Sequence, residues 1–143
     1  AAGDYVLVVK VGSAEDTQEF SVAKQKITAV TIASFTEAAD SDSLATYDPG
    51  TLTATLTPTV AGTATPVVDE AACVIANVDG DTIATGDTIV VKITVELTDA
   101  NNNEFASTIQ ANNVTLTGAT ATEVTGVAIE NGDLVITATT TVA

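Results

Sequence analysis

The sequence predicts an all-β protein whose strands form an antiparallel β-sandwich. Thr and Val are abundant, whereas Met and Arg, which favour helices, are absent. Short apolar runs recur with turn residues between them about every eight to twelve residues, a spacing typical of sandwiches. The chain carries no long amphipathic pattern that could supply the crossover helices of a parallel sheet. We therefore expect roughly nine or ten short strands and no parallel α/β fold.

Composition limits the classes of protein to consider. The 143 residues are enough for one domain with a short arm, and at 45% hydrophobic and 16% charged the chain is too apolar to be disordered. No apolar run approaches the roughly 18 residues of a membrane-spanning helix, so no membrane insertion is expected. The first residues, Ala1-Ala2-Gly3, are compatible with a secreted product cut after small residues, although a trimmed chain would look the same.

The net charge excludes some partners. Nineteen acidic residues face four lysines, and the formal charge is −15. Nucleic acid and anionic membranes are therefore not expected as partners, because binding them needs Lys and Arg. The acidic surface either keeps the protein soluble by self-repulsion, or it collects Ca²⁺ or suits high salt.

The chain begins with two predicted strands. Residues 4–11 are apolar on both faces, which is typical of a strand buried on both sides. Residues 12–16 supply a turn, and residues 17–23 return as the second strand. One face of the first strand carries Tyr5, Leu7, Val9 and Val11, and the other carries Val6, Val8 and Lys10.

Residues 27–35 are predicted to form a third strand, with Val30 and Ile32 on the face opposite Ile27 and Phe35. An exposed loop is expected over residues 36–50. Residues 51–60 alternate between Thr and apolar positions, and Pro58 predicts that this strand ends there or runs along an edge.

The second half holds the clearest patterns. Residues 88–98 alternate strictly and predict the centre of a sheet, because five large apolar side chains share one face. Asn131-Gly132 between two alternating runs predicts a hairpin with a type I′ turn over residues 127–138. Residues 62–66 are predicted to form a turn, and residues 105–109 and 113–117 to form weaker strands.

Residues for catalysis are scarce, and no enzymatic activity is expected. Without His, the usual base for a Ser or Cys nucleophile is missing, as are His ligands for a catalytic zinc. A carboxylate pair could serve a glycosidase, but such a cleft is usually rich in aromatic residues, and these make up only 3%. The single Cys73 is expected to be a buried apolar residue.

Calcium is the one cofactor that the sequence suggests, because it needs only oxygen ligands. The alternative is that these Asp and Asn residues close turns and bind nothing. Asp99 begins an alternation like the start of an EF-hand loop, but Glu104 stands where Gly is required and Gln110 where the bidentate Glu belongs. The candidate ligands are Asp79, Asp81, Asp87, Asp99, Asn101, Asn103 and Glu104.

Two other binding features are weaker. Asn113-Val114-Thr115 fits an N-glycosylation acceptor, although such a triplet also arises by chance in a Thr-rich chain. A carbohydrate-binding face would need more aromatic residues than the scattered Tyr5, Phe35 and Tyr47. The sequence names no small-molecule ligand.

Two segments resemble immunoglobulin-like repeats of bacterial surface and S-layer proteins. Residues 19–24 (EFSVAK) followed by 27–32 (ITAVTI) are similar to the junction between tandem repeats, and residues 97–101 (LTDAN) to a turn inside a repeat. The resemblance implies that residues 27–143 are one immunoglobulin-like sandwich and that residues 1–26 are an N-terminal arm, in which residues 4–23 would be the closing hairpin of a preceding repeat. It also implies a non-enzymatic protein that is secreted and lies at the cell surface.

Two functions follow for the arm, whose candidate assembly residues are Tyr5, Val6, Leu7, Val8, Val9 and Val11. It either packs on its own domain, or it completes a sheet of a neighbouring copy, as a donor strand does in self-assembling pilins. The leading hypothesis is a homo-oligomer or polymer: a filament or S-layer subunit joined by strand complementation. The alternatives are a monomeric spacer or binding repeat of a large adhesin and a phage tail or virion decoration module.

Overall fold

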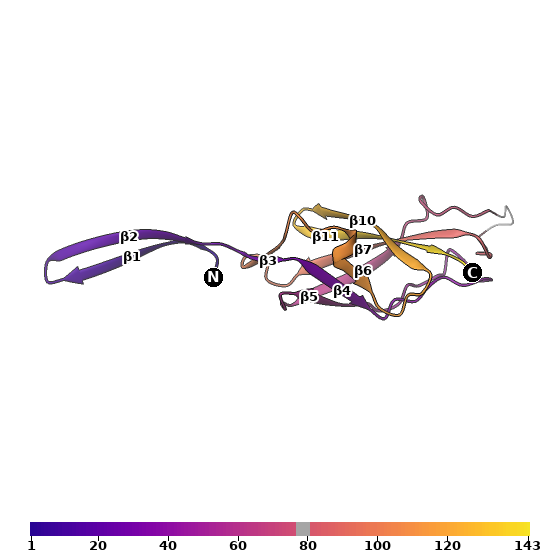
Figure 1. The fold of residues 1–143 in the computed structure, drawn as a ribbon, viewed down its shortest axis with the longest axis horizontal. Coiled ribbons are helices and arrows are strands. Elements are labelled where there is room, and N and C mark those ends of the chain that lie inside the picture. The colour runs from indigo at the N-terminus through magenta and orange to yellow at the C-terminus, as the bar shows by residue number, and fades with distance from the viewer. Residues whose placement is uncertain (77–80) are drawn as a thin grey trace.

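The computed structural model describes residues 1–76 and 81–143 and shows a nearly all-β protein (Figure 1). The described residues form eleven strands and one short 3₁₀ turn, η1 (Ala111–Asn113), and contain no α-helix. None of them belongs to a helix that could cross a membrane. The strands are β1 (Gly3–Val11), β2 (Ala14–Val22), β3 (Gln25–Ile27), β4 (Ala29–Ala33), β5 (Thr53–Thr57), β6 (Gly62–Val68), β7 (Thr88–Leu97), β8 (Asn103–Phe105), β9 (Val114–Leu116), β10 (Thr122–Glu130) and β11 (Asp133–Thr141).

Two sheets pack face to face over one core. A four-stranded antiparallel sheet has the order β10-β11-β7-β6, and a three-stranded sheet has the order β5-β4-β9. Their facing apolar side chains form the main cluster, as alternation along half-buried strands requires. The buried members include Val30, Ile32, Leu56, Val91, Ile93, Val95, Val114, Leu134, Ile136 and Ala138.

The strongest sequence predictions concern the four-stranded sheet, and they are confirmed. β7 lies between β11 and β6, so the alternating run at residues 88–98 is central. Asn131 and Gly132 join β10 to β11 with φ of 53° and 93°, the positive values that a type I′ turn requires. β5 ends at Thr57 before Pro58 and is an edge strand, also as predicted.

Three predictions are wrong in detail. The run at 27–35 is interrupted at Thr28 and again at Ser34, whose φ of 68° turns the chain, so Ile27 and Phe35 are buried together with Val30 and Ile32. Gly62 begins strand β6 and not a turn, because an edge strand tolerates Pro66. β3 with β8 and β4 with β9 pair in parallel, so the fold is not purely antiparallel.

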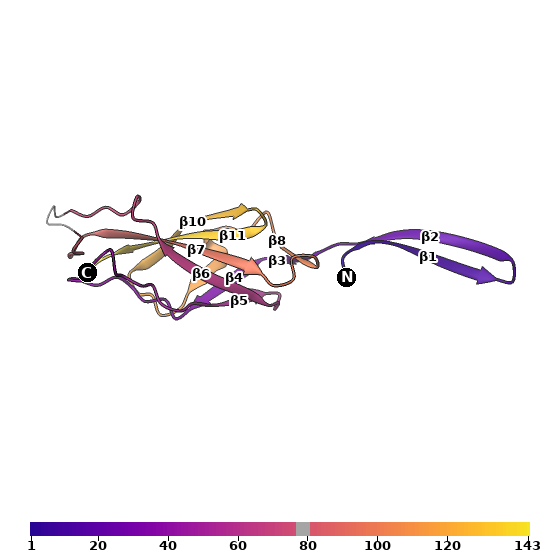
Figure 2. The same cartoon turned by 180° about the vertical axis from the view of Figure 1, so that it is seen from behind.

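The N-terminal strands stand apart from both sheets. β1 and β2 form a separate two-stranded antiparallel sheet that projects along the long axis of the molecule (Figures 1 and 2). The C-terminus lies at the opposite end of the two-sheet domain (Figure 2). We call residues 3–22 the arm.

Candidate assembly surface

The arm is a regular hairpin with two unlike faces. β1 and β2 pair in register from Gly3 with Val22 to Val11 with Ala14, and the turn is only Gly12 and Ser13. The predicted turn over residues 12–16 is therefore too long, since β2 starts at Ala14. Directly paired residues share a face of the sheet, so this register decides which side chains gather.

The first face is apolar, and we call it the docking face. Tyr5 pairs with Phe20, and their rings stack with centroids 5.5 Å apart. Leu7 and Val9 continue the face but oppose Gln18 and Asp16. The apolar members of the docking face are Tyr5, Leu7, Val9, Val11, Phe20 and Val22.

The second face of the arm is mainly polar. Val6 and Val8 oppose Glu19 and Thr17, and the Lys10 ammonium lies 2.8 Å from the Glu15 carboxylate. The expectation of a strand apolar on both faces was drawn from residues 4–11 alone. Pairing with β2 changes it, because the polar side chains of the return strand join Val6 and Val8.

The arm does not bury its docking face on its own domain. Every residue of β1 and β2 is exposed, and the apolar side chains of β1 range from 37% exposed at Tyr5 to 75% at Val11. Of the two packing alternatives, the one in which the arm adds strands to its own domain is therefore wrong for the described residues.

Residues 99–104 hold the base of the arm. The Ala2 amide donates to the Asn102 side-chain oxygen at 2.7 Å, and Lys24 Nζ donates to the Ala100 carbonyl at 2.6 Å. The Gln25 amide donates to the Asn102 carbonyl, and Lys26 pairs with Glu104. These contacts set the direction in which the arm leaves the domain. No pattern in the sequence predicts this role of Asn102.

Part of the predicted calcium loop is used in this anchor. Asp99 accepts hydrogen bonds from the amide and the side chain of Asn102, and the Asn103 side chain donates to the Asp99 carbonyl at 2.9 Å. Glu104 is engaged by Lys26, and this ion pair lowers the pKa of Glu104. Asn101 lies in the same turn.

The other candidate calcium ligands lie elsewhere. Asp87 is buried, and its carboxylate accepts from the Ala76 and Ala84 amides at 2.7 and 2.9 Å. Asp81 is exposed, and Asp79 lies outside the described residues. Within the described ranges, no three acidic, Cys or His side chains come together as a metal site. Calcium binding therefore stays a prediction, and the described candidate ligands do not come together in one site.

Asn113 and Cys73 are both partly exposed. The side-chain oxygen of Asn113 accepts from the Gln110 amide at 2.9 Å in the turn η1, and its glycosylation stays a prediction. Cys73 was predicted to be buried, but it is only partly buried. Its sulfur accepts a hydrogen bond from the Val90 amide at 3.3 Å.

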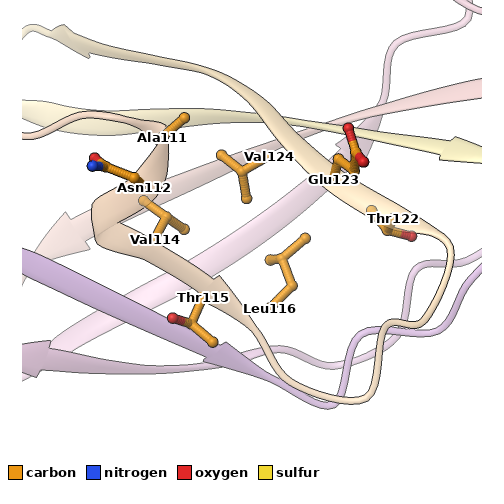
Figure 3. A pocket seen from close by; sticks show the side chains of 8 residues that line it. All are labelled: Ala111, Asn112, Val114, Thr115, Leu116, Thr122, Glu123 and Val124. Atoms are coloured by element: carbon orange, nitrogen blue, oxygen red, sulfur yellow. The ribbon is translucent and has the colours of Figure 1, made fainter.

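A second feature, not foreseen from the sequence, is a pair of hollows beside β10. A hollow of about 550 Å³ lies between β9 and the start of β10, where Leu116 and Val124 point into the space between the strands (Figure 3). A second hollow of about 250 Å³ lies at the other end of β10, against Ile109. We call the two hollows together the β10 groove.

A β-bulge makes the groove side of β10 apolar from Val124 to Ile129. The register with β11 shifts between Val124 and Gly126. This shift keeps Val124, Val127 and Ile129 opposite the inward-facing residues of β11. Strict alternation would have turned Val127 and Ile129 outward.

Comparison with protein-family models, with curated proteins and with solved structures found no match to this chain. The arm, its anchor and the β10 groove are therefore the candidate functional features of the described residues.

Proposed function

We propose that this chain is a structural, non-enzymatic subunit that assembles with copies of itself through the arm into an extracellular filament or surface layer. Its two-sheet domain is of the immunoglobulin-like kind. The observation that carries the proposal is the docking face, which is apolar along the whole of β1 and exposed on a hairpin held away from the domain.

The stability of the arm favours a partner that covers it. A lone two-stranded hairpin is marginal in water, and it gains stability when more strands or another layer cover its apolar face. Monomeric soluble proteins also rarely leave large apolar patches uncovered, and such patches mark interaction sites. The arm is therefore stabilised by a partner that covers the docking face.

A second copy is the partner that gives a surface structure. When the arm of each copy docks on the domain of the next, donor and acceptor surfaces differ, so the contact is head-to-tail and does not close by itself. The arm lies at one end of the long axis, which favours a linear array (Figure 1). The extracellular location rests on the resemblance to surface repeats.

A spacer repeat is the second candidate function. The arm and the C-terminus lie at opposite ends of the molecule, as the two junctions of a bead in a string would. In that case the arm belongs to the fold of a preceding repeat, and the chain described here stays monomeric.

The arm's two faces supply a matched test. Leu7→Glu places a charge in the docking face, and Val8→Glu places the same charge on the second face one residue away. Burying an unpaired carboxylate is costly, so we expect Leu7→Glu to weaken assembly by about 2 kcal/mol or more, whereas Val8→Glu changes it much less. Sedimentation velocity and electron microscopy of the full chain measure both.

Both variants should melt like the wild type at a concentration where all three are monomeric, because both positions are exposed. A wild-type chain that remains monomeric at millimolar concentration would contradict the proposed function and favour the spacer. Equal assembly of the two variants would contradict the role of the docking face.

A further inference from the structure

We propose that the acceptor is the β10 groove: β1 of one copy adds as a new strand to the free edge of β10 in a neighbouring copy, with the docking face turned into the groove. This inference rests on the proposed function and adds the acceptor surface that receives the docking face. The partner is a second copy of this chain.

The edge of β10 has the unpaired backbone that strand addition needs. β10 pairs with β11 on one side, and on its other side no described strand joins it in a ladder. Across the groove, β9 is likewise an edge strand, paired with β4. Exposed edges of this kind are templates for a strand from another chain.

The dimensions of donor and acceptor agree. β1 and β10 are both nine residues long. From Tyr5 to Val11 the docking face spans about 20 Å, and from Thr122 to Ile129 the groove side of β10 spans about 23 Å. The four docking side chains of β1 therefore cover the groove along most of its length.

The chemistry also agrees. A strand paired with β10 directs every second side chain toward the space between the two sheets. On the acceptor, the apolar part of that space is lined by Leu116, Val124 and Val127 and ends at Ile129, which is 42% exposed. Polar side chains, among them Asn112 and Glu123, border the same space. Tyr5, Leu7, Val9 and Val11 are apolar side chains with the spacing to fill it.

Charge favours β1 over β2 as the strand that pairs. β10 carries Glu123 and Glu130. β2 would bring three more carboxylates beside them, whereas β1 brings one carboxylate and the ammonium of Lys10. Like charges on neighbouring strands are destabilising, so β1 is the better partner.

The opposite side of the domain is a poorer acceptor. There β6 is the edge of the four-stranded sheet, and Pro66 deprives it of one backbone donor. The inward-facing Ala64 and Val68 of β6 already pack against the core. The hollow beside β6 is bordered by Asp69, Lys92 and Glu130 as well as by Val67, which points to the outer face of the sheet.

Disulfide trapping between copies tests this pairing in the full chain. In a Cys73→Ser background, one copy carries Val8→Cys, and a second, tagged copy carries Ala128→Cys or Glu123→Cys. All three positions are exposed, and Val8 lies on the second face of the arm, so the docking face itself is unchanged. Glu123 and Ala128 border the two hollows of the β10 groove. Thr65→Cys on β6 is the matched control, an exposed outer-face position at the other edge of the same sheet.

We expect mixed disulfide dimers between Val8→Cys and one of the two β10 positions, at least about tenfold more than with Thr65→Cys. Assembled protein that cross-links through Thr65→Cys, or mainly as Val8 to Val8 pairs, overturns the β10 acceptor and leaves the proposed function standing. A protein that forms no assembly at all overturns both.

A surface variant gives an independent readout. Ile129→Arg charges the groove, and Val67→Arg places the same charge on the other edge strand, where the side chain is 61% exposed. We expect Ile129→Arg to raise the concentration needed for assembly about tenfold or more, with Val67→Arg close to wild type. The reverse order would contradict the acceptor.

Discussion

At the scale of single residues, two carboxylates hold loops in place. Asp87 was a candidate calcium ligand, and Glu37 had no role predicted from the sequence. Asp87 is buried, and its two oxygens accept from the backbone on either side of the turn that precedes β7. Its backbone also exchanges hydrogen bonds with Ala84 and Val142. Asp87 therefore ties the C-terminal residues to the start of the central strand.

Replacing Asp87 by Asn should destabilise the domain. The amide can accept at one oxygen, but its NH₂ group then faces a backbone N–H donor that loses its partner. We expect Asp87→Asn to lower the free energy of unfolding by about 2 kcal/mol, as for other buried unsatisfied donors. Urea unfolding measures it, and a change below about 0.5 kcal/mol would contradict the role assigned to Asp87.

Glu37 holds the loop between β9 and β10. Its carboxylate accepts four hydrogen bonds, from the amide and hydroxyl of Thr120, the Ala121 amide and the Thr122 hydroxyl, at 2.7 to 2.9 Å. Burial alone would raise the pKa of Glu37, but these hydrogen bonds outweigh it and hold the pKa below its ordinary value of 4.5. Glu37 thus fixes the end of β10 that borders the groove.

The lowered pKa predicts the pH dependence of a Glu37→Gln variant. The charged form is favoured in the folded state, so its stabilisation is complete above the ordinary value and disappears as pH falls through the lower folded value. We expect Glu37→Gln to cost about 1 kcal/mol at pH 7, because the site is partly exposed, and less as the pH drops below 4.5. Unfolding at pH 7 and pH 3 measures it; a cost that grows toward pH 3 would contradict this assignment.

At the scale of elements, the sequence predicted what depends on local pattern and turn chemistry. The alternation at residues 88–98 and the Asn131-Gly132 turn each determine their own structure, and both were predicted correctly. The start of β6 was missed because Pro66 reads as a turn until its edge position is known. The polarity of the arm's second face was also missed, because it depends on which residues of β2 lie opposite those of β1.

The candidate site was predictable only where it depends on local sequence pattern. The apolar run in residues 4–11 marked the arm as a surface needing a partner. Its anchor at Asn102 and the β10 groove depend on contacts between residues distant in the chain, such as Ala2 with Asn102. The groove depends further on a bulge at residues 124–126, which an alternating pattern does not reveal.

At the scale of the whole molecule, donor and acceptor surfaces lie on one chain. The arm projects from one end of the domain (Figure 1), and the larger hollow of the β10 groove lies between β9 and the start of β10 (Figure 3). A net charge of −15 disfavours indiscriminate association, so contacts between copies need specific apolar burial to overcome repulsion. Assembly should therefore strengthen as salt screens these charges.

Hydrogen exchange distinguishes a free arm from an arm docked on β10. A dilute chain should exchange the amides of β1 rapidly, because every residue of that strand is exposed and the edge facing away from β2 is open to water. In concentrated, assembled protein, we expect strong protection of residues 5–11 together with residues 122–130. Arm amides that exchange equally fast in dilute and assembled protein would contradict docking of the arm.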